Sequence, residues 1–271
     1  MQAYSKRLIP LVGAGVLATI GLLAIGQAQN QTVAGPSAML FGAQVSSWAK
    51  LSANGQVMEA GVTIPLSGIE KAPAADPNHQ GMNMQMGPEV NLEFPDAVKK
   101  ATFLDHMELW WEPLGHPPDR YLTPHFDFHF FGLPASETKT IDCKNLTAPT
   151  PDLTPQGYAP AVPPQAKPEE FCVPLMGFHA LPLSEFSAPG QLKAGLFDQV
   201  MIAGAYASKF AFVEPMITRE FLLKKQSFSL AVPRPPVLGR KTLYPTQFNA
   251  TYDSASNAYQ FVFSGFTMTD K

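Results

Sequence analysis

The sequence offers little support for several common classes of function. Its 271 residues contain 19 Lys and Arg against 22 Asp and Glu, so a nucleic-acid partner is not expected. We find no Gly-x-Ser-x-Gly elbow, phosphate-binding loop or dinucleotide-binding fingerprint, which leaves the usual serine-hydrolase and nucleotide chemistries unsupported. No internal repeat is visible, and this excludes a solenoid or propeller.

A long apolar run, Leu8 to Ile25, lies near the start of the chain. Lys6 and Arg7 precede it and Gly26-Gln27-Ala28 follows it as a small-x-small cleavage site, so we predict that residues 1–28 are a signal peptide. A retained membrane anchor is the alternative. No cysteine follows the run, which excludes a lipoprotein anchor. Cleavage would change the formal charge from −3 to −5 and give a periplasmic or extracellular protein with no stable membrane insertion.

Only two cysteines are present, Cys143 and Cys172, and they flank a proline-rich stretch. Disulfides persist in the compartments to which exported proteins go, so we expect the two residues to be bonded. Closing a loop of that size stabilises by about 3 to 4 kcal/mol in the chain-entropy model. We interpret residues 136–174 as one long loop held by this bond.

Short alternating segments, 27 Pro and 20 Gly predict an all-β fold, either an antiparallel β-sandwich or a jelly-roll-like barrel. Asn54-Gly55 lies between two alternating runs and indicates a hairpin. We predict one domain over residues 29–271, with no regular structure from Gln29 to Ser37 and an exposed loop from Ser67 to Gly87. The best helix candidate is Pro215 to Lys225.

The most informative segment is Thr123 to Phe131, with the sequence TPHFDFHFF. Successive side chains of a strand point to opposite faces, so His125, Asp127 and His129 share one face, and the alternating phenylalanines share the other. Upstream, His106 and Glu108 are also two residues apart and repeat the pattern. Two short strands would therefore present three imidazoles and two carboxylates.

Imidazole and carboxylate ligands together indicate a transition-metal site, with zinc as first choice and Mn, Fe or Cu as alternatives. Residues at i and i+2 lie about 6.5 to 7 Å apart and can share an ion, whereas residues at i and i+4 lie about 13 Å apart. His125 and His129 therefore need not bind the same ion. Either the strand is bent, or Asp127 and one histidine pair with His106 and Glu108 across the sheet.

Three further residues are possible ligands, and each has a simpler explanation. His116, in a proline-rich link, could equally bond backbone carbonyls at a turn. His179 follows Gly177-Phe178 and could instead be a satisfied histidine at a strand edge. Glu214 precedes Pro215 and could instead favour the amino end of the predicted helix.

Two readings compete with a metal site of this kind. A half-exposed strand of any antiparallel sheet also places Phe in the core and polar residues in water, which would suit a non-catalytic binding or structural protein of the cell envelope. His79 with Met82, Met84 and Met86 resembles the thioether sets that hold Cu(I), which would suit a periplasmic copper-handling protein. The alternative for these methionines is a flexible, exposed loop.

Four segments together resemble a family of exported bacterial proteins of unknown function: His106–His116, Pro124–Phe130, Val173–His179 and Phe212–Thr218. The strings PHFDFHF and EPMIT are its most specific parts, and the similarity extends from about Met39 to the C-terminal hairpin. The resemblance implies a β-rich fold, a tendency to form homo-oligomers and a motif set without assigned roles. The methionine-rich and proline-rich loops are not parts of this pattern.

These observations predict an exported metal-binding β-sandwich protein of unknown physiological role. His106, Glu108 and the HFDFHF strand are its expected ligands. If the protein is an enzyme, a metal-activated water beside a carboxylate base would perform hydrolysis, while an open Fe or Mn position would favour oxygen chemistry.

Overall fold

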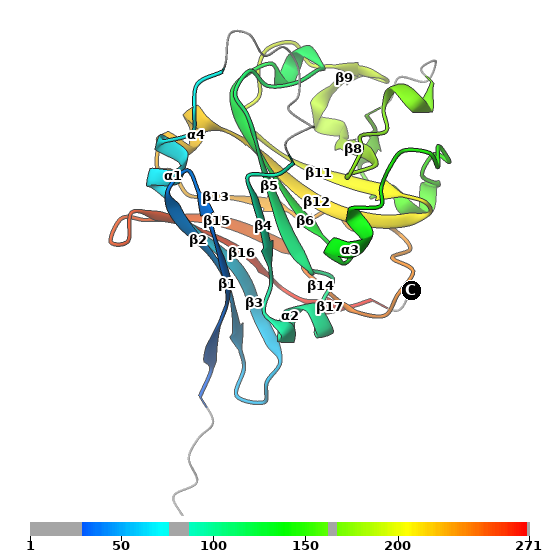
Figure 1. Cartoon of the computed structure of the whole chain (residues 1–271). Coiled ribbons are helices and arrows are strands. Elements are labelled where there is room, and N and C mark those ends of the chain that lie inside the picture. Colours follow the sequence, from blue (N-terminus) through cyan, green and yellow to red (C-terminus); the bar gives the residue numbers. More distant parts are fainter. Residues whose placement is uncertain (1–28, 76–86, 162–166, 270–271) are drawn as a thin grey trace, which may run out of the picture.

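The fold is an antiparallel β-sandwich, which was one of the two predicted alternatives. The computed structural model describes residues 29–75, 87–161 and 167–269. Two large sheets pack face to face, and loops gather on the outer side of the second sheet (Figure 1). The sheets formed by the described residues do not close into a barrel. No described helix is long and apolar enough to cross a membrane.

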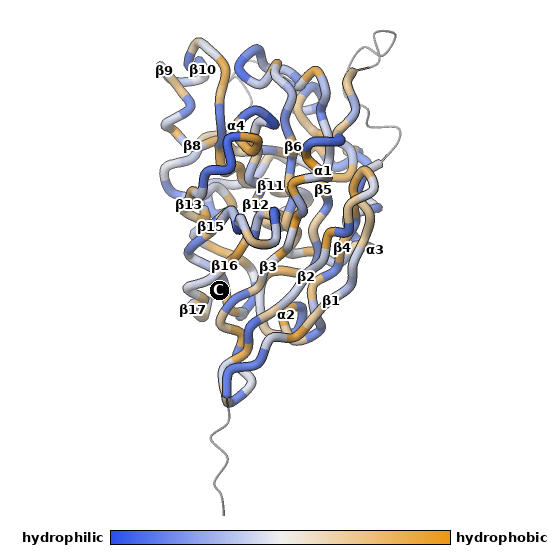
Figure 2. The backbone as a smooth tube through the Cα atoms, turned by 90° about the vertical axis from the view of Figure 1, so that its left-hand side faces the viewer, coloured by the Kyte–Doolittle hydropathy of each residue, from blue (hydrophilic) through white to orange (hydrophobic). Residues whose placement is uncertain are grey.

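The first sheet has six strands. In spatial order they are β1 (Gln31–Leu40), β2 (Ala43–Leu51), β3 (Val57–Pro65), β16 (Ala258–Ser264), β15 (Gln247–Asp253) and β13 (Phe228–Ala231). Buried and more exposed residues alternate along β2, because one face of this sheet meets water (Figure 2). The predicted turn at Asn54-Gly55 joins β2 to β3, with Gly55 at φ 81°.

The second sheet has seven strands and carries the histidines of the motif. In spatial order they are β4 (Val90–Glu93), β5 (His106–Glu112), β6 (His125–Phe131), β12 (Lys209–Thr218), β11 (Gln199–Tyr206), β8 (Phe178–Pro182) and β7 (Tyr158–Pro160). Two small two-stranded sheets pair β9 (Phe186–Ala188) with β10 (Gln191–Leu192) and β14 (Leu243–Tyr244) with β17 (Thr267–Met268).

The helices are short and lie between strands. The α-helices are α1 (Leu66–Glu70), α2 (Asp96–Ala101), α3 (Ala135–Thr138) and α4 (Arg219–Leu223), and the 3-10 turns are η1 (Asp119–Tyr121), η2 (Pro151–Leu153), η3 (Pro168–Glu170) and η4 (Leu183–Glu185). Thr218 caps α4 by accepting a hydrogen bond from the Phe221 N–H at 3.2 Å, which satisfies one of the free donors of the first turn.

Phenylalanines of β6 form the centre of the sandwich core. Phe128 packs edge-on against Phe261 of the opposite sheet with ring centroids 4.8 Å apart, and Phe130 packs against Phe263 at 4.7 Å. These rings are fully buried. The predicted aromatic face is therefore confirmed as the inner face of the second sheet.

The outer face of the second sheet is also covered, by loops and by the small β9–β10 sheet. Two apolar clusters lie there. One contains Trp110, Phe131, Leu133, Met176, Ala211 and Phe212. The other contains Tyr121, Leu181, Phe197, Val200, Ile202 and Met216. Arg120 and Glu185 form an ion pair that joins two of the covering segments. The polar face of β6 is thus enclosed.

Several local predictions were wrong. Gln31–Ser37 belongs to edge strand β1, which pairs with β2, although its mixed sequence lacks a clear alternation. The helix predicted from Pro215 begins only at Arg219, because the chain from Lys209 to Thr218 continues as β12 between two partner strands. The predicted exposed loop after Ser67 starts inside helix α1, whose Ile69 is buried in the core.

The proline-rich segment is less irregular than predicted. Helix α3 overlaps the start of this segment. The segment also contains the short strand β7, which pairs with β8 at the edge of the second sheet. The expected disulfide is confirmed, since the sulfurs of Cys143 and Cys172 lie 2.15 Å apart. The predicted signal peptide and the methionines Met82, Met84 and Met86, with His79, lie outside the described residues.

Candidate metal centres

All seven residues of β6 are buried, including its histidines and its aspartate. His125 is 0% exposed, Asp127 4% and His129 1%. A half-exposed strand would have left them in water, so that alternative does not describe this sheet. Burying ionisable groups is costly unless they are paired, protonated appropriately or bound to an ion.

Strand register brings the other polar residues to the same face. Glu108 of β5 pairs directly with His129 of β6. On the other side, Phe212 pairs with Phe131 and Met216 with Asp127, a register that places Glu214 of β12 opposite His129. Glu108, His129 and Glu214 therefore form one row across three neighbouring strands.

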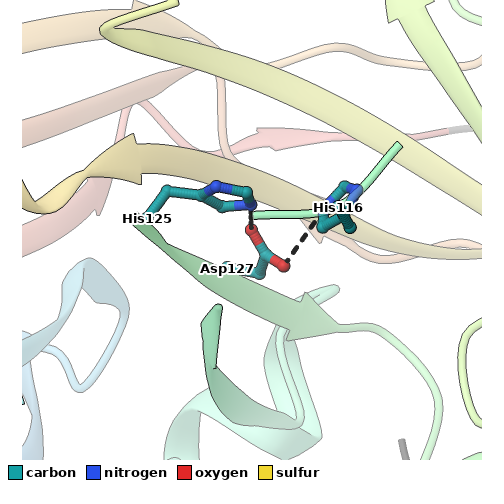
Figure 3. A group of neighbouring side chains, drawn as sticks. All are labelled: His116, His125 and Asp127. Atoms are coloured by element: carbon teal, nitrogen blue, oxygen red, sulfur yellow. Dashed lines mark ion pairs between the residues drawn. The ribbon is translucent and has the colours of Figure 1, made fainter. Parts of the chain in front are cut away.

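The first group of ligand atoms, which we name centre A, consists of His116, His125 and Asp127 (Figure 3). Its three ligand atoms lie within 4.8 Å of one another. Nε2 of His125 is 3.1 Å from Oδ1 of Asp127, and Nε2 of His116 is 3.6 Å from Oδ2. A tetrahedral zinc ion with bonds of about 2.0 to 2.1 Å separates its ligands by about 3.3 Å, so these distances fit.

His116 reaches centre A because the link between β5 and β6 folds tightly over the sheet. Gly115 has φ 70°, and a Cβ there would collide with the backbone of Tyr121 and Thr123. Nδ1 of His116 bonds the carbonyl of Pro117 at 2.9 Å, and Nδ1 of His125 bonds that of Thr123 at 2.7 Å. Both rings thereby turn Nε2 toward Asp127, which is the usual arrangement of histidine ligands.

The second group, which we name centre B, consists of His129, His179 and Glu214, again within 4.8 Å. Oε2 of Glu214 is 3.5 Å from Nε2 of His129 and 3.7 Å from Nε2 of His179. His179 comes from β8, two strands beyond β12. Gly204 of β11 lies directly beside it, where a Cβ would collide with the ring of Phe212, and that ring packs against both histidines.

Both centres contain buried polar atoms that lack a hydrogen-bond partner. They include Nε2 of His125 and Oδ1 of Asp127 in centre A, and both ring nitrogens of His129 and Oε2 of Glu214 in centre B. The 3.1 Å separation of His125 and Asp127 does not have hydrogen-bond geometry. Native structures contain few such atoms, and an ion is one of the species that satisfies them.

The protonation states at centre A favour an ion pair in the metal-free protein. Burial lowers the pKa of His116, but contact with Asp127 outweighs burial and raises it to about 9. Burial also raises the pKa of Asp127, yet His125 and His116 together hold it well below its usual range. At neutral pH, His116 is therefore protonated and Asp127 ionised.

Centre B has the opposite character. Burial lowers the pKa of His129 to about 3 and that of His179 to about 4, so both imidazoles are neutral at pH 7. Burial, reinforced by the charge of Asp127, raises the pKa of Glu214 well above its usual range. Two neutral imidazoles thus face a carboxyl group whose protonated form is favoured by burial.

His106 and Glu108 belong to neither group of three. Nε2 of His106 is 3.6 Å from Oε1 of Glu108, and Nδ1 is 3.1 Å from Oδ1 of Asp105. His106 also stacks on Phe131 with ring centroids 5.0 Å apart. Six of the eight predicted candidates are therefore brought together in two centres. The other two, His106 and Glu108, form a separate pair.

Sequence reasoning missed Glu112, which is buried on the same face as Glu108. Burial, and then the charge of Asp127, raises its pKa to about 8. The alternation His106, Glu108, Trp110, Glu112 would have placed it there had the strand been extended by one residue. Glu112 is paired with His125 in the β5–β6 register and therefore lies beside centre A.

Comparison with known proteins gives one similarity. Residues 52–111 match the model of the TTHB210-like family, which is described as a hypothetical protein. No curated protein and no solved structure matches the chain. The matching segment includes His106 and Glu108 but none of the six residues of centres A and B. The chain is thus similar to an uncharacterised family over its β3–β5 region.

Proposed function

We propose that this protein binds two transition-metal ions, one at centre A and one at centre B. Each ion would have two imidazoles and one carboxylate as ligands. Zinc is the first choice for such a set, and Mn, Fe or Cu are alternatives. The observation that carries the proposal is the convergence of buried, unpartnered ligand atoms at both centres.

Three protein ligands leave room for a further ligand, as in catalytic rather than structural zinc sites. Each centre has one partly exposed member, since the side chain of His116 is 16% exposed and that of His179 is 17% exposed. The remaining ligands lie beneath apolar side chains that exclude water. This combination supports binding of an exchangeable small molecule at each centre.

Hydrolysis is the candidate activity. A bound zinc ion would supply Lewis-acid chemistry, and the chain itself would supply neighbouring carboxyl groups that can hold or accept a proton. Glu112 is such a group beside centre A, with a pKa of about 8 in the metal-free protein. A carboxyl group that titrates near neutral pH suits general acid–base work.

Elemental analysis of protein purified without a metal-affinity tag tests the proposal. We expect about two equivalents of metal per chain, and about one in each of the variants His125→Ala and His129→Ala, because each removes one of three ligands. His79→Ala, which alters a histidine of neither centre, is the control and should keep both equivalents. No metal in the parent protein, with unchanged thermal stability in the variants, would instead indicate a structural polar face.

Metal binding is expected to release about two protons per chain at pH 7, because ligands must be deprotonated to bind. One would come from His116, whose pKa is about 9, and one from Glu214, whose pKa is raised well above its usual range. Zinc affinity at centre A should rise about tenfold per pH unit up to about pH 9 and then level off. Calorimetry in two buffers of different ionisation enthalpy measures the release, and a value near zero would contradict these protonation states.

We also propose that the protein is exported. The disulfide between Cys143 and Cys172 supports this, because such bonds persist mainly outside the cytosol. The intact mass of the native protein tests cleavage after Ala28, and a mass equal to that of the full chain would oppose it.

A further inference from the structure

Two of the four histidines in the two centres have a backbone hydrogen bond that orients the ring. Nδ1 of His116 and of His125 bond the carbonyls of Pro117 and Thr123. The side chain of His179 is 17% exposed, so its ring can reach water. His129 is the exception, since neither of its ring nitrogens has a partner and both are buried.

The position of His129 explains this difference. His116 lies in a loop, His125 lies at the start of β6, and His179 lies near the start of β8 with a partly exposed side chain. His129 instead lies within β6, which is paired on one side with β5 and on the other with β12. Carbonyls within a paired strand are used by the ladder and point sideways in the sheet. An acceptor for Nδ1 of His129 must therefore come from a side chain on the same face.

Glu108 occupies the position that such an acceptor requires. It is directly opposite His129 in the β5–β6 register. The Cβ atoms of residues paired in this way lie about 4.5 to 5.5 Å apart. Its Oε1 accepts a hydrogen bond from Asn91 Nδ2 at 3.0 Å. Its Oε2 is buried and has no partner. One unpartnered nitrogen and one unpartnered carboxylate oxygen thus belong to residues that face each other.

We infer that Glu108 is the positioning residue of centre B. When Nε2 of His129 binds the ion, Nδ1–H donates to Oε2 of Glu108, directly or through one water molecule. This hydrogen bond fixes the tautomer and the ring orientation and makes the ligand nitrogen more basic. The inference rests on the proposed metal binding and gives Glu108 a role there other than that of a ligand.

The surroundings of Glu108 fit this role. Asn91 on β4 holds Oε1 from one side, and His106 lies 3.6 Å from the same oxygen. His106 is in turn held by Asp105 at 3.1 Å and by stacking on Phe131. The predicted ligand pair His106 and Glu108 is accordingly interpreted as a support behind His129.

The test uses the His125→Ala background, in which centre B is the one complete centre, and compares Glu108→Leu with Glu108→Gln. Zinc affinity is measured by competition with a chromophoric chelator. We expect Glu108→Leu to weaken binding by about 10 to 100-fold, as for other residues that support a ligand, and Glu108→Gln to weaken it less because its amide oxygen still accepts. Glu59→Gln, a carboxyl variant on β3 of the first sheet and remote from both centres, is the control and should leave this affinity unchanged.

A second readout separates positioning from a general loss of structure. In the zinc-loaded parent, NMR should show His129 with its proton on Nδ1 and slow exchange of that proton, and Glu108→Leu should remove the slow exchange. Equal zinc affinity and an unchanged His129 signal in both Glu108 variants would overturn the inference while leaving the metal centre intact. Absence of zinc binding by the His125→Ala parent would overturn the metal centre itself.

Discussion

Removal of bound zinc by a chelator is expected to lower the free energy of unfolding by about 8 kcal/mol, or about 4 kcal/mol for each centre when free zinc is a thousandfold above its dissociation constant. The reason is linkage, because the ligands of each centre are assembled in the folded protein. Those of centre B, namely His129, His179 and Glu214, come from distant parts of the chain, and those of centre A are brought together by the folding of the β5–β6 link over the sheet. An ion that binds the folded state alone stabilises it by its binding free energy.

Urea unfolding in zinc-buffered solution and in excess chelator measures this difference. The double variant His125→Ala, His129→Ala serves as the control, because without both centres its unfolding midpoint should not respond to zinc. A parent protein whose midpoint is the same in zinc and in chelator would contradict both centres at once. An effect of about half the expected size, lost in only one single variant, would show that one centre binds.

Asp127 and Glu214, two of the buried carboxyl groups, are expected to respond differently to amide substitution in the metal-free protein. At pH 7, Asp127→Asn should lower the free energy of unfolding by about 3 to 5 kcal/mol, because it leaves the protonated His116 buried without its counterion. Glu214→Gln should change stability by less than about 1 kcal/mol, since glutamine resembles the protonated carboxyl group already present there. Both variants nevertheless remove a metal ligand.

The pH dependence gives the sign of this effect. The pKa of His116 in the folded protein is about 9, which is above its ordinary value of 6.5. The ion pair therefore contributes fully to the free energy of unfolding below about pH 6.5, and this contribution is lost as the pH rises through about 9. The cost of Asp127→Asn should therefore shrink above pH 9. Denaturant unfolding of chelator-treated protein at pH 7 and pH 9.5 tests this, and equal costs for the two amide variants at pH 7 would contradict the assigned protonation states.

Local alternation was sufficient to predict the two faces of β6. The pattern HFDFHF placed phenylalanines on one side and His125, Asp127 and His129 on the other, and the structure has this arrangement. The hairpin at Asn54-Gly55 was likewise determined by neighbouring residues. Such features depend on the sequence within a few positions.

The division of ligands between two centres could not be predicted locally. It depends on strand order, because β12 lies next to β6 and brings Glu214 opposite His129, while β8 lies two strands further and brings His179 over Gly204. The helix predicted at Pro215 failed for a related reason: two partner strands extend β12 beyond a proline whose propensity favours a helix start. Tertiary pairing outweighed local preference at this site.

Because β6 is enclosed on both faces, it has no position at which a side chain meets only water. Every second residue fills the sandwich core, and the residues between them occupy the polar cluster. A substitution anywhere along the strand must therefore disturb either packing or a buried charge arrangement, so sequence drift there should be strongly restricted while the covering loops vary.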